Sequence, residues 1–390
     1  MNSRNKFINR TVYVWLFISS LYYINSLLTG EINMNIDEGI FHKAFKYFIC
    51  LSISLCIVFW KKSWGILFFP LSLSTLAVYF YIFFPEANQI INVYIVVISM
   101  SGLIILLTSL DDISLEKIPY LLVWTGVVVG VFSFIEIFFY GDLFVEHWSR
   151  TGGMRSISTL FNPNNLGLYL GMCLIFLTGI NYRPLKKLII SLPIIFGFVL
   201  SGSRTAWVAF IATIFFSNLY SFIKYKNTDF AVIRIRTLLL LIFLGFFATT
   251  INNIEWSHQD SSQLQLREID METANIRLEN FSAYVESIDY SIFIPDLDAI
   301  RTHLISDCAY LVILNSFGLF LLLLFAISTV VIFKLNDGTN IPYNNYWRYI
   351  LVFYLIAGMA DSTTNAFPNN QLFFISLGSL ICYRWRPNHA

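Results

Sequence analysis

Twelve apolar runs, each close to the length of a membrane-spanning helix, dominate this chain of 390 residues. A helix of about 20 apolar residues crosses the hydrocarbon layer of a membrane. Charged residues make up 13% of the chain, against about 25% in soluble domains. The sequence therefore predicts an all-α integral membrane protein, a single polytopic domain over residues 1–390, with helices near 11–30, 44–60, 64–84, 90–110, 118–140, 163–181, 186–202, 204–223, 237–251, 308–334, 346–365 and 370–385.

The Lys and Arg residues predict the orientation of these helices, because such residues favour the cytoplasmic side. With the N-terminus inside, 17 of the 25 Lys and Arg residues lie on the cytoplasmic side and 8 lie on or near the outer side. The basic start MNSRNKFINR resembles that of a signal peptide, but the apolar run after it is long and shows no small-residue cleavage site. We therefore expect an uncleaved first helix and both termini in the cytoplasm.

Two outer loops follow from this topology, at 141–162 and 252–305. The larger loop is rich in helix-forming residues and has no Gly or Pro from 261 to 288. This composition predicts about two to four short amphipathic helices lying at the outer surface.

Composition and charge exclude several classes of function. A net charge of +1 does not suggest nucleic-acid binding. The five Cys residues have no CxxC spacing, so we expect no disulfide framework and no metal site. Transporters usually carry ionisable groups near the middle of the membrane, whereas Glu136, Arg204, Asp307 and Asp361 lie near the outer face in this topology. This distribution favours an enzyme that works at the outer leaflet.

Three predicted helices begin at the outer face with capping residues. Asn162 precedes Pro163, Ser203 precedes Arg204, and Ser306 or Asp307 precedes the tenth helix. Each helix start carries a partial positive charge and unpaired N–H groups, which attract anions. Arg204 in such a first turn suits a lipid-linked phosphate or diphosphate. An equally open interpretation is that Arg204 only extends to lipid headgroups.

Four segments resemble, in their order, the motifs of the O-antigen polymerase and O-antigen ligase superfamily. They are RTGGMRSISTLFNPNNLGLYL (150–170), VLSGSRTAW (199–207), NIRLENFSAYVESI (275–288) and DCAYLVILNSFGLF (307–320). The resemblance covers about 150–320, and the rest of the chain only through its topology. It implies a multi-spanning GT-C-type glycosyltransferase of the bacterial inner membrane, which needs neither a metal nor another cofactor. Its expected reaction transfers a glycan from undecaprenyl diphosphate to an acceptor hydroxyl at the periplasmic face.

The resemblance also implies roles for individual residues. Arg204 and Arg277 would hold the diphosphate, and Asp307 would act as the base. Ligases typically have His where this chain has Asp307, so the match favours a polymerase. His303 is the alternative counterpart if the alignment shifts by one helical turn. The chain also lacks the family's G.G after the Arg277 segment, and this departure leaves the geometry of that loop open.

Besides His303, four residues are expected to bind substrate. They are Arg150, Arg155, Asn164 and Tyr310. Each of these roles has a simpler alternative. The two Arg residues can be solvated loop residues, Arg277 can belong to a surface helix with ion pairs, and Tyr310 can anchor the chain at the membrane surface.

The expected partners are an undecaprenyl-diphosphate-linked oligosaccharide and membrane lipid, with a polysaccharide chain-length regulator as a further candidate. A ligase that transfers the glycan to lipid A-core is the alternative function. A flippase or other transporter of the lipid-linked unit is a more distant alternative.

Overall fold

The computed structural model describes residues 3–22, 24, 48–49, 52, 88–107, 110, 112–148, 155–160, 162–225, 272–287, 308–335, 344–361, 363 and 366–385. Every regular element within these ranges is a helix, which confirms the all-α prediction. The helices are α1 (Ser3–Ser20), α5 (Asn88–Leu107), α6 (Asp112–Trp148), α7 (Pro163–Gly179), α8 (Pro184–Leu200), α9 (Arg204–Tyr225), α11 (Glu272–Ser287), α13 (Ala309–Leu335), α14 (Asn344–Ala357) and α15 (Asn369–Trp385).

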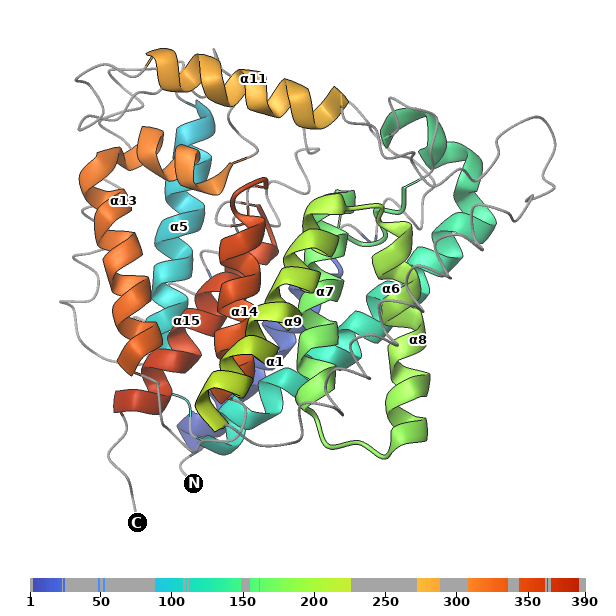
Figure 1. Ribbon diagram of the computed structural model, residues 1–390. Helices are drawn as coiled ribbons and strands as arrows, with labels where there is room; N and C mark the ends of the chain where they lie inside the picture. Colours follow the sequence, from blue (N-terminus) through green and yellow to red (C-terminus); the bar gives the residue numbers. More distant parts are fainter. Residues whose placement is uncertain are drawn as a thin grey trace.

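The helices form a bundle with α11 lying across one end (Figure 1). We call this end the α11 end. Helices α7, α9, α13 and α15 begin at the α11 end, whereas α1 begins and α15 finishes at the opposite end. These four helices therefore run in one direction and α1 runs in the opposite direction.

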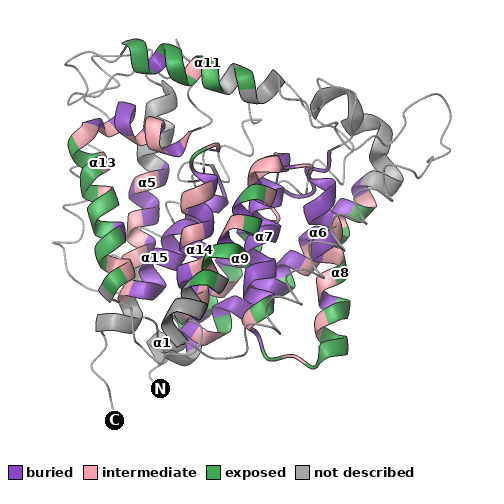
Figure 2. Ribbon diagram, viewed as in Figure 1, coloured by how far each residue is buried: buried purple, intermediate pink, exposed green. Residues whose placement is uncertain are grey.

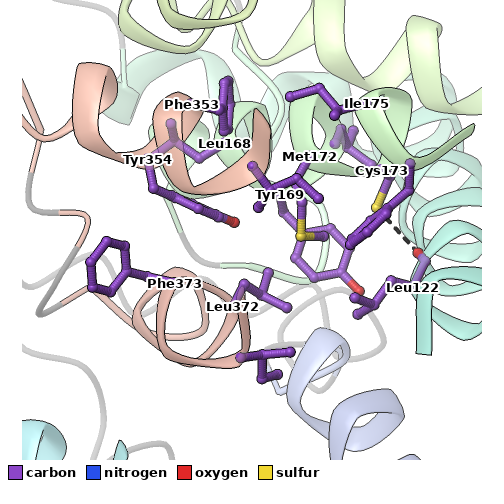
Figure 3. Packing of buried hydrophobic residues seen from close by; sticks show 14 of the residues in the cluster. Leu122, Leu168, Tyr169, Met172, Cys173, Ile175, Phe353, Tyr354, Leu372 and Phe373 are labelled. Atoms are coloured by element: carbon purple, nitrogen blue, oxygen red, sulfur yellow. Dashed lines mark hydrogen bonds between the residues drawn. The ribbon is translucent and has the colours of Figure 1, made fainter. Parts of the chain in front are cut away.

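Helix α7 occupies the centre of the bundle and packs against α6, α8, α9, α14 and α15. Nearly all of its residues are buried. Figure 3 shows Tyr354 of α14 between Tyr169 of α7 and Phe373 of α15. The sulfhydryl of Cys173 donates to the Leu122 carbonyl of α6 at 3.1 Å. An apolar helix that is buried on all sides must be surrounded by other helices. Helix α7 therefore holds these five helices together.

Helix α13 is bent at Gly318, where φ is 79° and ψ is 169°. A residue with a side chain rarely adopts this φ, so glycine is needed at the bend. The first part of α13 lies below α11, and the second part descends along the bundle (Figure 1). The bend thus lets one helix contact both α11 and the length of the bundle.

Helix α11 is attached to α13 through Tyr284. This side chain is buried, packs against Leu311 and Leu314, and donates its hydroxyl to Asn315 Oδ1 at 2.6 Å. The other α11 side chains that the structure describes are exposed or half-buried. Tyr284 is therefore the main described contact that holds α11 in place.

Replacing Tyr284 with Phe should loosen α11 without unfolding the bundle. The change keeps the ring but leaves buried Asn315 Oδ1 without this donor, at a cost of about 1–2 kcal/mol. Hydrogen exchange of the intact chain should show faster exchange over 272–287 and unchanged exchange over α7. Unchanged protection of α11 would contradict the anchoring role of this hydrogen bond.

Two described helices are long and apolar enough to cross a membrane, Ser114–Glu136 and Ala309–Lys334. The second is mostly exposed along its descending part, where Phe320 is 72% exposed (Figure 2). The shorter apolar segment Arg204–Ser217 lies in α9.

The described helices match most of the expected runs, with shifted ends. Helix α1 covers 3–20 where 11–30 was predicted, and α14 stops at Ala357 where 365 was predicted. Helix α6 continues to Trp148, through the first eight residues of the segment expected as an outer loop. The predicted runs 44–60 and 237–251 lie almost wholly outside the described residues, and so does 64–84.

Candidate functional site

The turn between α8 and α9 places Arg204 at the first position of a helix. Gly202 in this turn has φ +55°, which allows α8 to end at Leu200 and α9 to begin four residues later. The hydroxyl of Ser203 accepts the N–H of Ala206 at 3.3 Å. The prediction that Ser203 caps α9 is confirmed.

The start of α7 has the expected cap as well. The Asn162 side chain accepts the N–H of Asn164 at 2.7 Å, and Pro163 is the first helical residue. Pro fits this position because its missing N–H would have no partner there.

The starts of α7 and α9 lie against each other. A Cβ atom added to Gly167 would lie 2.7 Å from Ser203 Cβ and 2.9 Å from Ser201 Oγ. The absence of a side chain at Gly167 therefore lets the first turns of the two helices approach closely.

The start of a third helix, α15, contacts the first turn of α7. Asn369 donates its amide to the backbone oxygen and the side-chain oxygen of Asn165, at 3.2 and 3.1 Å. In return Asn165 donates to the Phe367 carbonyl at 3.2 Å. Three helix N-termini with partial positive charge thus converge at the α11 end.

Arg155 links the loop at 155–160 to these helix starts. Its Nε donates to the Ser201 carbonyl at 2.9 Å and its Nη2 donates to Asn164 Oδ1 at 2.8 Å. The backbone N–H of Ser156 donates to the Leu200 carbonyl at 2.9 Å. The guanidinium group therefore joins the α8–α9 turn to the first turn of α7.

Glu136 of α6 fixes this loop from below. Its side chain is fully buried and accepts the N–H groups of Ile157 at 3.0 Å and Ser158 at 2.7 Å, together with the Ser156 hydroxyl. The Ser158 hydroxyl also donates to the Val129 carbonyl at 2.7 Å. The carboxylate thus holds three consecutive loop residues against α6.

The structure brings some of the predicted site residues together. Arg155, Asn164 and the Arg204 helix start form one cluster, with Arg204 half-buried. Tyr310 lies at the start of α13, where its hydroxyl donates to the Leu355 carbonyl of α14. Arg277 lies on α11, two helical turns before Tyr284. Arg150, His303 and Asp307 lie outside the described residues.

The sequence analysis missed the contribution of α15. The segment FPNNQ at 367–371 repeats much of FNPNN at 161–165, and both segments open a helix at the α11 end. The similarity of the two segments was the available signal for α15, although the two copies do not belong to a repeat of fixed period.

The cluster is suited to binding an anion. It combines three helix N-termini with the cations Arg155 and Arg204, and the buried carboxylate of Glu136 is occupied by the loop. Within the described part of the chain, no three His, Cys, Asp or Glu residues are grouped as a metal site. Comparisons with protein-family models, characterised proteins and solved structures find no match to this chain.

Proposed function

We propose that this chain is a membrane-embedded polymerase of surface polysaccharide, similar to O-antigen polymerases. In this role it joins oligosaccharide repeat units by transferring the growing glycan from undecaprenyl diphosphate to a hydroxyl of the next unit. The observation that carries the proposal is the contact between two of the motif segments. Arg155 and Asn164 of the first segment meet Ser201 of the second, beside the Arg204 helix start.

The chemistry of the reaction fits this cluster. When the glycan leaves, the diphosphate gains negative charge, which fixed guanidinium groups and helix N-termini stabilise. Arg204 supplies a cation in a capped first turn, and we assign Arg277 as the second cation by its motif. Asp307 is the proposed base for the acceptor hydroxyl.

The proposed setting is an inner membrane crossed by about 12 helices in a GT-C-type arrangement. The α11 end then faces the periplasm, and both termini face the cytoplasm. Two features support this orientation: α1 begins and α15 finishes at the same end of the bundle, and α11 lies across the other end (Figure 1). The two long apolar helices of α6 and α13 fit a membrane setting.

Replacing Arg204 with Ala should abolish long polysaccharide chains. Loss of one preorganised donor to a developing charge typically slows a reaction by about 100-fold or more. The measurement is the glycan ladder of a strain that lacks the gene and expresses the variant. Arg183→Ala is the matched control, because Arg183 is an exposed Arg at the opposite end of the bundle. A normal ladder from Arg204→Ala, at equal protein level in the membrane, would overturn the assignment.

Deletion of the gene separates the proposed function from its alternatives. Loss of a polymerase leaves lipid A-core that carries a single repeat unit. Loss of a ligase leaves core without any repeat, with chains retained on the lipid carrier. Loss of a flippase leaves units on the cytoplasmic side.

A further inference from the structure

The first turn of α15 contains two buried amide side chains with atoms that have no hydrogen-bond partner among the described residues. Asn370 is 0% exposed and Gln371 is 1% exposed. Neither Asn370 Nδ2 nor the side-chain Nε2 and Oε1 of Gln371 makes a hydrogen bond to any residue that the structure describes. Burying an amide without a partner costs about 1–3 kcal/mol. Two neighbouring residues of this kind therefore indicate a partner that the described part of the chain does not supply.

The orientation of Asn370 identifies which of its atoms needs a partner. Its Oδ1 already accepts the backbone N–H of Gln371 at 2.8 Å, so the amide nitrogen is the unpaired group. Gln371 offers both a donor and an acceptor whichever way its amide is turned. The unpaired atoms of the two side chains are thus two amide nitrogens, which donate, and one amide oxygen, which accepts.

These amides adjoin the cluster already described. Asn369, the residue before them, is bonded to Asn165 in the first turn of α7, and Asn164 is bonded to Arg155. The Tyr354 hydroxyl lies 3.4 Å from Asn369 Oδ1, and the ring of Phe373 packs against Tyr354 directly after the amides (Figure 3). Both amides therefore lie in the first turn of α15, at the α11 end of the bundle.

The chemistry of the three unpaired atoms selects the ligand class. The diphosphate diester of a lipid-linked glycan carries no proton at neutral pH and only accepts hydrogen bonds, so it would leave Gln371 Oε1 unpaired. A sugar hydroxyl both donates and accepts, and neighbouring hydroxyls on one ring can satisfy donors and acceptors together. We propose that Asn370 and Gln371 bind hydroxyl groups of a carbohydrate and form the glycan-binding part of the site. This inference rests on the proposed function and adds a carbohydrate subsite on α15 beside the anion-binding cluster.

The test uses the full chain in lipid nanodiscs. The probes are oligosaccharide repeat units, released by mild acid from the surface polysaccharide of the strain that carries the gene, and inorganic diphosphate. Gln371→Met keeps a similar volume but removes the amide. It should weaken binding of the oligosaccharide by about 30-fold, the effect of two ordinary hydrogen bonds. Binding of diphosphate should stay unchanged. Gln371→Leu is the second variant with the same expectation.

Stability without ligand gives an independent readout. A residue that only supports the fold would destabilise the chain when replaced. Gln371→Met should instead unfold at the same or a higher temperature, because the variant no longer buries an unpaired amide. Ser379→Ala is the matched control, since it removes another buried polar group from α15 that has no partner among the described residues, more than two turns away from Gln371. This control should bind the oligosaccharide as the unmodified chain does.

Several outcomes would overturn the inference. They are unchanged oligosaccharide binding by both variants, a loss of diphosphate binding instead, and a fall in unfolding temperature that shows a structural role. A separate result tests the proposed function. If the unmodified chain fails to restore long polysaccharide in the deletion strain, the polymerase proposal fails, whatever the binding data show. If it restores long chains and the variants still bind the oligosaccharide normally, only the carbohydrate subsite fails.

Discussion

Glu136→Ala is expected to destabilise the chain by about 3 kcal/mol or more and to abolish long polysaccharide. The carboxylate accepts hydrogen bonds from Ser156, Ile157 and Ser158 in a site closed to water. Removing it leaves several buried donors unsatisfied, each at a cost of about 1–3 kcal/mol. The measurements are the thermal unfolding of the purified chain and the glycan ladder of the complemented deletion strain.

Glu116→Ala is the matched control for this prediction. Glu116 lies on the same helix, toward the opposite end of the bundle, and is partly exposed. Its loss should change the stability by a few tenths of a kcal/mol. If Glu136→Ala and Glu116→Ala unfolded at the same temperature, the carboxylate would not be the anchor of the loop.

Arg155→Ala is expected to reduce long-chain polysaccharide by about 100-fold while the helices stay folded. The guanidinium group donates to the Ser201 carbonyl and to Asn164 Oδ1, and it thereby joins the turn before α9 to the start of α7. Small displacements of a site can slow a reaction by about this factor. Each of the two lost bonds should lower the free energy of unfolding by about 1.5–3 kcal/mol, the range for a hydrogen bond to a charged group.

Arg155→Lys separates positioning from charge. Lysine keeps the positive charge but lacks the planar fork that bonds two acceptors at once. If Arg155 acts by linking the two segments, the lysine variant should be nearly as defective as the alanine variant in the glycan ladder. Full activity of Arg155→Lys would show that only its charge matters.

The parts of this site that the sequence predicted are the local ones. Caps at Asn162 and Ser203 depend on residues within one turn, so their side chains and spacing are visible in the sequence. The motif segments at 150–170 and 199–207 were also expected to contribute to one site, and Arg155 of the first donates a hydrogen bond to Ser201 of the second.

The parts that escaped prediction depend on distant partners. Two of the three loop groups that donate to Glu136 are backbone N–H groups, which every residue except Pro has, so the loop sequence does not identify the contact. The Asn165–Asn369 pair joins residues 204 positions apart. The end of α14 was also misplaced: the predicted helix ran to 365, whereas the helix ends at Ala357 and the chain turns in the segment GMAD that follows.

The bend at Gly318 has a mechanical consequence for a membrane-embedded chain. The first part of α13 is held by α11 through Asn315 and by α14, where the Ala309 N–H donates to the Gly358 carbonyl at 2.9 Å. A helix that crosses a membrane tilts when the bilayer thickness changes. The descending part of α13 can change its tilt about Gly318 while the first part keeps its contacts. In the proposed membrane setting, the geometry of the α11 end would thereby be insulated from the lipid composition around the bundle.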